Sequence, residues 1–126
     1  ELLMVKSISK TKSLLSEIIA SIENVKGHEL NLLDLGSIEN TVTNYFIICN
    51  GTSNTHVKAI VDSIEENVKK NTEEKPYSIE GIENAEWVLI DYIDVIVHVF
   101  QKPFRDRYDL ENLWGDALTI KIASNC

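Results

Sequence analysis

The sequence predicts a single α/β domain of the α+β type, in which one mixed β-sheet of about five strands packs against helices. Segments with helical periodicity alternate with β-prone apolar runs in the order α, β, β, α, β, β, β, α. The chain has 126 residues, which suits one hydrophobic core and is too short for two. It contains neither a repeat nor a linker, so we treat residues 1–126 as one domain.

The first part of the chain predicts a helix followed by two strands. Apolar residues at three-and-four spacing indicate an amphipathic helix over about residues 9–26, capped near Gly27. In residues 29–35, apolar and polar side chains alternate with a period near two, which predicts a strand. Residues 45–49 form a continuous β-prone run, which predicts a second strand. Because this second run is apolar on both faces, we expect it inside the sheet, with helices on either side.

A second helix is expected after the turn at residues 51–55, with Ser53 or Thr55 as its N-terminal cap. The helix extends to about residue 70, and charged residues lie opposite its apolar face. That face consists of Val57, Ile60, Val61, Ile64 and Val68. The polar segment that follows ends at Pro76, which cannot continue a helix.

The last third of the chain predicts a short strand near residues 77–80, a turn at Gly81 and then a β-hairpin. The apolar runs 87–90 and 95–100 form the strands of this hairpin. Pro103 and the charged residues after it are expected to form a turn. Helical spacing then predicts a final helix, with apolar positions at Leu110, Leu113, Trp114, Ala117 and Leu118.

The chain is acidic, with 12 lysines and arginines against 20 aspartates and glutamates and a net charge of −8. Such a molecule repels phosphate backbones and anionic membranes, so we expect neither direct sequence-specific nucleic-acid binding nor a membrane role. Residues 80–116 carry nine carboxylates against three basic residues. This segment either faces a basic partner or is a solvated acidic surface, and charge alone does not separate the two.

The cysteines and the absence of long apolar runs predict a cytoplasmic protein. Cys49 and Cys126 have neither the spacing of metal ligands nor the density of a disulfide scaffold, which fits a reducing compartment. No apolar run reaches the length of about 18 residues that a membrane span needs, and no signal-peptide pattern is present.

The most enzyme-like element is the turn Gly51-Thr52-Ser53, between a predicted strand and a predicted helix. Backbone amides at a helix N-terminus can hold a phosphate, so a nucleotide-binding enzyme of nucleotidyltransferase-like fold is the alternative hypothesis. However, the turn lacks the lysine of a P-loop, and no Asp-x-Asp or Asp-x-Glu pair follows it to hold magnesium. Capping of the second helix is therefore the favoured interpretation.

The other candidate residues also favour structural roles. Asp91 and Asp94 flank the predicted hairpin turn, where carboxylates commonly accept backbone hydrogen bonds. His28, His56 and His98 have no zinc-ligand spacing, and the place of His98 within a predicted strand favours a hydrogen-bonded, partly buried imidazole. We expect no catalytic residue, no cofactor and no metal.

Both tryptophans have a structural and a functional interpretation. Trp114 lies on the apolar face of the predicted last helix, which favours the core. Trp87 begins a strand directly after the acidic residues 80–86, and an aromatic anchor beside a charged rim is the anatomy of a binding patch. From the residues alone, core packing and partner binding stay equally open for Trp87.

A series of ordered motifs runs along the chain. They are YFIICNGTS at residues 45–53, His56-Val57, Glu80-Gly81, Trp87, Asp91, DVIVHVF at residues 94–100, Arg105, Tyr108, Leu110-Glu111 and Leu113-Trp114. In this order and at these separations the motifs resemble the ribosomal silencing factor family, also called the Iojap family. The resemblance extends from the first predicted helix to about residue 117.

This resemblance implies a translation inhibitor whose fold is related to nucleotidyltransferases but which is not an enzyme. It implies docking on the large ribosomal subunit through ribosomal protein L-fourteen, so that the small subunit cannot join, notably when nutrients are scarce. It assigns Trp87 to the partner surface, with Glu80, Asp91 and Asp94 near it, and these carboxylates suit a basic ribosomal protein. A homodimer through the same surface is a further alternative.

The chain departs from the family pattern at two places near this surface. Ile93 stands in the hairpin where the family usually has glycine, and Thr43-Asn44 precede Tyr45 where the family commonly has Ala-Asp. Because β-branched residues resist a positive φ, we expect the hairpin turn to differ in type. The second change removes a carboxylate that would add to the surface.

Overall fold

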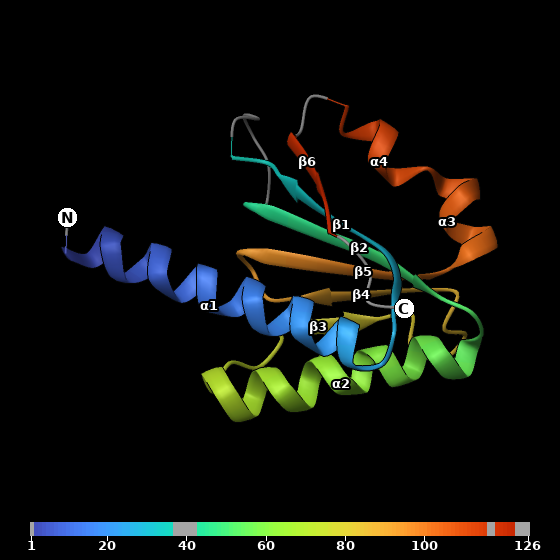
Figure 1. The fold of residues 1–126 in the computed structure, drawn as a ribbon, viewed down its shortest axis with the longest axis horizontal. Helices are drawn as coiled ribbons and strands as arrows, with labels where there is room; N and C mark the ends of the chain where they lie inside the picture. Colours follow the sequence, from blue (N-terminus) through green and yellow to red (C-terminus); the bar gives the residue numbers. More distant parts are fainter. Residues whose placement is uncertain (1, 37–42, 116–117, 123–126) are drawn as a thin grey trace.

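A six-stranded mixed sheet forms the centre of the molecule, which confirms the predicted fold class and adds one strand (Figure 1). The computed structural model describes residues 2–36, 43–115 and 118–122. Its elements are α1 (Leu2–Asn24), β1 (His28–Asp34), β2 (Tyr45–Gly51), α2 (Asn54–Thr72), β3 (Ser78–Glu80), β4 (Trp87–Asp91), β5 (Val95–Gln101), α3 (Lys102–Tyr108), α4 (Leu110–Leu113) and β6 (Leu118–Lys121). The strand order is β3-β4-β5-β2-β1-β6.

Strands β2 and β5 form the only parallel pair in this order and lie at its centre; the other neighbours pair antiparallel. Along β2, Ile47 and Cys49 face the helices α1 and α2, whereas Phe46 and Ile48 face the opposite side, where α3 and α4 lie (Figure 1). All four side chains are buried. The prediction that this strand lies inside the sheet, covered on both faces, is confirmed.

The first helix ends in a motif that differs from the expected glycine cap. Lys26, with φ of 58°, adopts the left-handed conformation, and Gly27 follows it. The amide of Lys26 donates to the carbonyl of Glu23 (3.0 Å) and that of Gly27 to the carbonyl of Ile22 (2.9 Å), as in a Schellman motif. Gly27 is required for close approach instead, because a β-carbon there collides with the Ile22 side chain.

The second helix begins as predicted. The Ser53 hydroxyl accepts a hydrogen bond from the amide of His56 (3.1 Å), so Ser53 rather than Thr55 is the N-terminal cap. Its buried residues are the five apolar positions expected from the sequence. Within the described part of the chain, no helix is both long enough and apolar enough to span a membrane.

The expected final helix is wrong in both extent and position. Residues 102–108, expected to form a turn, form helix α3, because Pro103 occupies the first turn of a helix, where its missing amide is tolerated. The helix α4 spans only Leu110–Leu113, and Leu118–Lys121 form the edge strand β6, paired with β1. Ala117, assigned to the final helix, lies outside the described residues.

In the hairpin between β4 and β5, Ile93 adopts a positive φ, so the expectation that a β-branched residue resists this conformation here is wrong. Ile93 has φ of 75° although it is β-branched. Its amide donates to Oδ1 of Asp91 (2.7 Å), and the amide of Asp94 donates to the carbonyl of Tyr92 (2.9 Å). These bonds hold the residue in a conformation that costs on the order of 1–3 kcal/mol.

Replacing Ile93 by glycine should stabilise the fold. Glycine adopts a positive φ without steric cost, and little burial is lost because the Ile93 side chain is 61% exposed. We expect Ile93→Gly to raise the free energy of unfolding by about 1 kcal/mol in urea titrations. Ile93→Ala is the matched control, because alanine removes the same exposed side chain but keeps the β-carbon. An equal gain in both variants would contradict backbone strain at this position.

Candidate functional site

The residues assigned to a partner surface gather mainly on one face of β3 and β4. Because β-strand side chains alternate, Trp87, Leu89 and Asp91 lie on the same side of β4, and Glu80 of β3 pairs with Leu89. We call these four residues the β3–β4 face. The helix α3 packs on β2 and β5 on this side of the sheet. The β3–β4 face therefore stays partly exposed at the edge of the sheet.

Trp87 is half-buried and tightly held. Its ring stacks on Phe100 (centroids 5.0 Å apart, planes at 24°) and lies 4.8 Å from the ring of Tyr108 on α3. Its indole Nε1–H donates to Nδ1 of His98 (3.0 Å). Gly81, with φ of 84°, lies so close that a β-carbon there collides with the Trp87 carbonyl. The indole N–H is satisfied inside the protein, so Trp87 offers a partner its apolar surface rather than a donor.

His98 is a support for Trp87 that sequence reasoning did not identify. Its imidazole is 3% exposed and lies edge-on to the ring of Phe46. Nδ1 accepts the indole hydrogen, which puts the imidazole proton on Nε2, a buried atom without a hydrogen-bond partner in the described structure. Burial lowers the pKa of His98 to about 4. The expectation of a hydrogen-bonded histidine is confirmed, but only the cross-strand geometry identifies Trp87 as its partner.

The acidic candidates occupy different places. Glu80 is exposed and Asp91 half-buried, both on the β3–β4 face. Asp94 lies in the turn beyond it, where its backbone carbonyl accepts from the amides of Asn44 and Tyr45 at the start of β2. The pKa of Lys10 on α1 is raised, chiefly by its ion pair with Glu74 and slightly by the charge of Asp94. Asp94 is therefore not part of the β3–β4 face.

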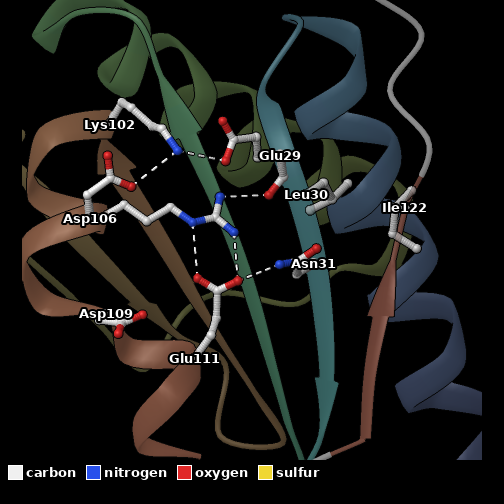
Figure 2. Close-up of a pocket in the computed structure, with 9 residues that line it drawn as sticks. Glu29, Leu30, Asn31, Lys102, Asp106, Asp109, Glu111 and Ile122 are labelled. Atoms are coloured by element: carbon white, nitrogen blue, oxygen red, sulfur yellow. Dashed lines mark hydrogen bonds and ion pairs between the residues drawn. The ribbon is translucent and has the colours of Figure 1, made fainter.

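A hollow of about 530 Å³ is lined by two cations, Lys102 and Arg105, and by four carboxylates (Figure 2). Arg105, 5% exposed, donates to the carbonyl of Glu29 (2.6 Å), to Oδ1 of Asn50 (2.8 Å) and to both carboxylate oxygens of Glu111 (2.9 and 3.1 Å). Glu111 also accepts from Asn31. Lys102 bridges two further carboxylates. Its cations are already paired, so the hollow presents a structural network that ties α3 and α4 to the sheet.

In the turn after β2, several backbone amides donate hydrogen bonds to groups within the protein. The amide of Thr52 donates to Nδ1 of His56 (2.9 Å), and Nε2 of His56 contacts the carbonyl of Val25 (2.7 Å). The amide of His56 donates to Ser53, and that of Val57 to the Ser53 carbonyl. The amides of Thr52, His56 and Val57 are thus engaged within the turn and the first turn of α2. The side chain of Ser53 caps α2, which confirms the capping interpretation.

The hairpin that carries Asp91 and Asp94 lies at the opposite end of the sheet from the turn after β2. In the parallel pair β2–β5, Tyr45 is opposite Val95 and Gly51 opposite Gln101. Six residues of strand separate these ends, or about 20 Å at 3.3 Å per residue. Asp91 and Asp94 therefore cannot hold a metal beside a phosphate bound at Gly51. Cys49 is no better placed for chemistry, because complete burial raises the pKa of its thiol to about 12.

Aromatic and acidic groups thus lie together at a partly exposed edge of the mixed sheet. The comparisons with known proteins identify the family. Residues 8–125 match the family model described as ribosomal silencing factor during starvation. The chain belongs to the ribosomal silencing factor family, as the sequence motifs indicated.

Individual relatives support the assignment. The chain is 40% identical to the ribosomal silencing factor RsfS of Bacillus subtilis over 106 residues, which are 84% of this chain and 88% of that protein. It is 31% identical to the chloroplastic protein Iojap of Arabidopsis thaliana over 86 residues, 64% of this chain and 33% of that protein. A crystal structure of a Chromobacterium violaceum protein superposes with a TM-score of 0.77 at 36% identity, covering 82% of this chain and 85% of that one.

His98 predicts a pH dependence of folding stability. Its pKa falls from 6.5 to about 4 on folding, so between these pH values the unfolded chain binds a proton that the folded protein excludes. The free energy of unfolding should decrease as the pH falls through this range, by up to about 3 kcal/mol, and should not change through His98 above it.

Urea titrations of the wild type and His98→Asn between pH 7 and pH 4 measure this contribution. Asparagine offers an oxygen acceptor to the indole N–H but does not titrate in this range. The variant should therefore show a shallower decline in stability. Identical pH profiles for the two proteins would contradict the role of His98.

Among the lysines and arginines, Arg105 should cause the largest loss of folding stability when it is removed. Arg105→Ala leaves Glu111, Asn50 and the Glu29 carbonyl without their shared donor, and we expect a loss of about 3 kcal/mol in the free energy of unfolding. Arg107→Ala is the control, because Arg107 is exposed and lies over the ring of Phe104. It should cost less than about 1 kcal/mol. Similar losses in the two variants would show that the network contributes little.

Proposed function

We propose that this protein represses translation in the cytoplasm by docking on the large ribosomal subunit through ribosomal protein L-fourteen. The docked protein occludes the surface that the small subunit must contact, notably when nutrients are limiting. Its action is steric and requires no catalysis. Membership of the ribosomal silencing factor family is the observation that carries this proposal.

The charge of the β3–β4 face and its surroundings supports a basic partner. Residues 80–94 contain five carboxylates and neither lysine nor arginine. Glu80, Glu83 and Glu86 are exposed, and they surround the loop that leads into Trp87. Acidic groups around an apolar centre speed association with a basic protein and orient it, while the apolar centre supplies affinity.

Trp87 supplies the centre of the proposed contact. Its packing against Phe100 and Tyr108 restricts the ring before any partner arrives, so little side-chain entropy is lost on binding. Leu89, half-buried next to it on β4, extends the apolar area. A homodimer through this same face would compete with ribosome binding.

Sedimentation of purified large subunits with this protein, followed by addition of small subunits, tests the proposal. Co-sedimentation with the large subunit and a loss of complete ribosomes are expected. If the protein does not sediment with large subunits at micromolar concentration, the proposed function is wrong. If it sediments but the subunits still join, docking stands and steric occlusion is wrong.

Trp87→Ala should weaken binding to large subunits about 30-fold, because removal of a central aromatic anchor costs about 2 kcal/mol or more. Circular dichroism establishes that the variant is folded. Ile120→Ala is the control, since Ile120 is an exposed apolar residue on β6, at the opposite edge of the sheet.

A charge variant keeps the test valid if Trp87→Ala does not fold. Glu80 is exposed, so Glu80→Lys should leave the fold intact, slow association and reduce its dependence on salt. Wild-type binding by folded Trp87→Ala or by Glu80→Lys would show that the partner contacts another surface.

A further inference from the structure

A second, smaller hollow lies at the far end of β4 from Trp87. It is lined by Tyr77, Asp91, Ile93 and Ile96 and has a volume of about 180 Å³. Sites for small-molecule ligands usually measure roughly 300–1,000 Å³, so this one suits a single side chain better than a cofactor. It is continuous with the β3–β4 face, because Asp91 belongs to both.

The acidic group of this hollow forms no ion pair with any basic side chain that the structure describes. Asp91 is half-buried, and its Oδ1 accepts the amide of Ile93 (2.7 Å), which fixes the carboxylate in place. None of the ion pairs formed among the described residues involves Asp91. The carboxylate is therefore oriented and partly dehydrated before any partner arrives, which strengthens its attraction for a cation.

The walls of the hollow are apolar and unusually exposed. The Tyr77 side chain is 77% exposed and that of Ile93 61% exposed, whereas Ile96 is buried at 8%. Ile93 reaches this position only by adopting a positive φ that costs on the order of 1–3 kcal/mol in a β-branched residue. A strained turn thus places an exposed apolar side chain next to a fixed carboxylate.

We propose that this hollow receives one long basic side chain, arginine or lysine, of the ribosomal protein that docks on the β3–β4 face. The assignment rests on the proposed function and extends its contact surface to Tyr77 and Ile93. The methylene groups of the basic side chain lie between Tyr77 and Ile93, and its charged end contacts Asp91. The exposed ring of Tyr77 also offers a face on which a guanidinium group can stack.

The position of the hollow fits one continuous docking surface. Four residues of strand separate Trp87 from Asp91, or about 13 Å at 3.3 Å per residue. Both side chains point to the same side of the sheet. One partner can therefore contact the aromatic anchor and fill the hollow together. An acidic chain of net charge −8 favours a basic occupant over an acidic or neutral one.

Binding of wild type, Asp91→Asn, Ile93→Gly and Ile93→Ala to purified large subunits tests the proposal. Asp91→Asn keeps an oxygen that accepts the Ile93 amide but removes the charge, so it should weaken binding about tenfold and reduce its salt dependence. Both Ile93 variants should weaken binding about fivefold through lost apolar contact. Asp62→Asn is the matched control, because Asp62 is exposed on α2, behind the opposite face of the sheet.

Measuring both the folding stability and the subunit affinity of Ile93→Gly makes this test specific. A role in the turn alone predicts a more stable protein with unchanged binding, whereas the proposal predicts a more stable protein that binds more weakly. If Asp91→Asn and Ile93→Gly both bind as tightly as the wild type, the hollow is not part of the contact, although Trp87 docking stands. If the wild type does not bind large subunits, the proposed function is wrong and the assignment of the hollow falls with it.

A second copy of this chain is the competing occupant. Analytical ultracentrifugation of the free protein at several concentrations distinguishes it. If the wild type is a dimer that Ile93→Gly converts to monomers, while binding to large subunits is unchanged, the hollow belongs to the dimer contact and the proposal is overturned.

Discussion

The parallel pairing of β2 with β5 is the constraint from which the rest of the arrangement follows. Both strands are apolar on both faces, so each face of the sheet centre needs a cover. The long helices α1 and α2 cover one face, whereas the other has only α3 and α4, which together span eleven residues. Such a short cover protects the centre but not the edge strands (Figure 1). The partial exposure of β3 and β4 is therefore a consequence of the layer sizes.

Arg105 connects this architecture to the proposed docking surface. Its guanidinium holds α3 against the ends of β1 and β2 through the Glu29 carbonyl and Asn50. It holds α4 through the carboxylate of Glu111 (Figure 2). The helix fixed in this way carries Tyr108, whose ring contacts Trp87. The hollow around Arg105 and the β3–β4 face thus have separate roles. The charges in the hollow position a helix, and the helix supports the aromatic residue that a partner would contact.

Sequence patterns predicted the elements whose residues repeat regularly and missed those set by tertiary contacts. The buried face of α2 follows from its spacing, but the helical spacing after Leu110 misled because β1 offers residues 118–121 an edge to pair with. The positive φ of Ile93 contradicts its intrinsic preference, since the Asp91 carboxylate and the hairpin register impose it. Of the four residues predicted for one partner surface, Trp87, Glu80 and Asp91 share a face of β3 and β4, whereas Asp94 lies in the turn beyond it. Their contact with a partner stays a prediction. The bond from Trp87 to His98 spans two strands and has no local pattern.

At the β4–β5 turn, folding stability and recognition place opposite demands on one residue. Glycine at position 93 would relax the backbone but would remove the apolar wall of the hollow, whereas isoleucine retains both the strain and the wall. The hydrogen bond from its amide to Asp91 then orients the carboxylate and the side chain together. A partner that meets two groups already fixed loses less entropy on binding. The energy stored in the turn is thus compensated by preorganisation, provided that a basic side chain fills the hollow.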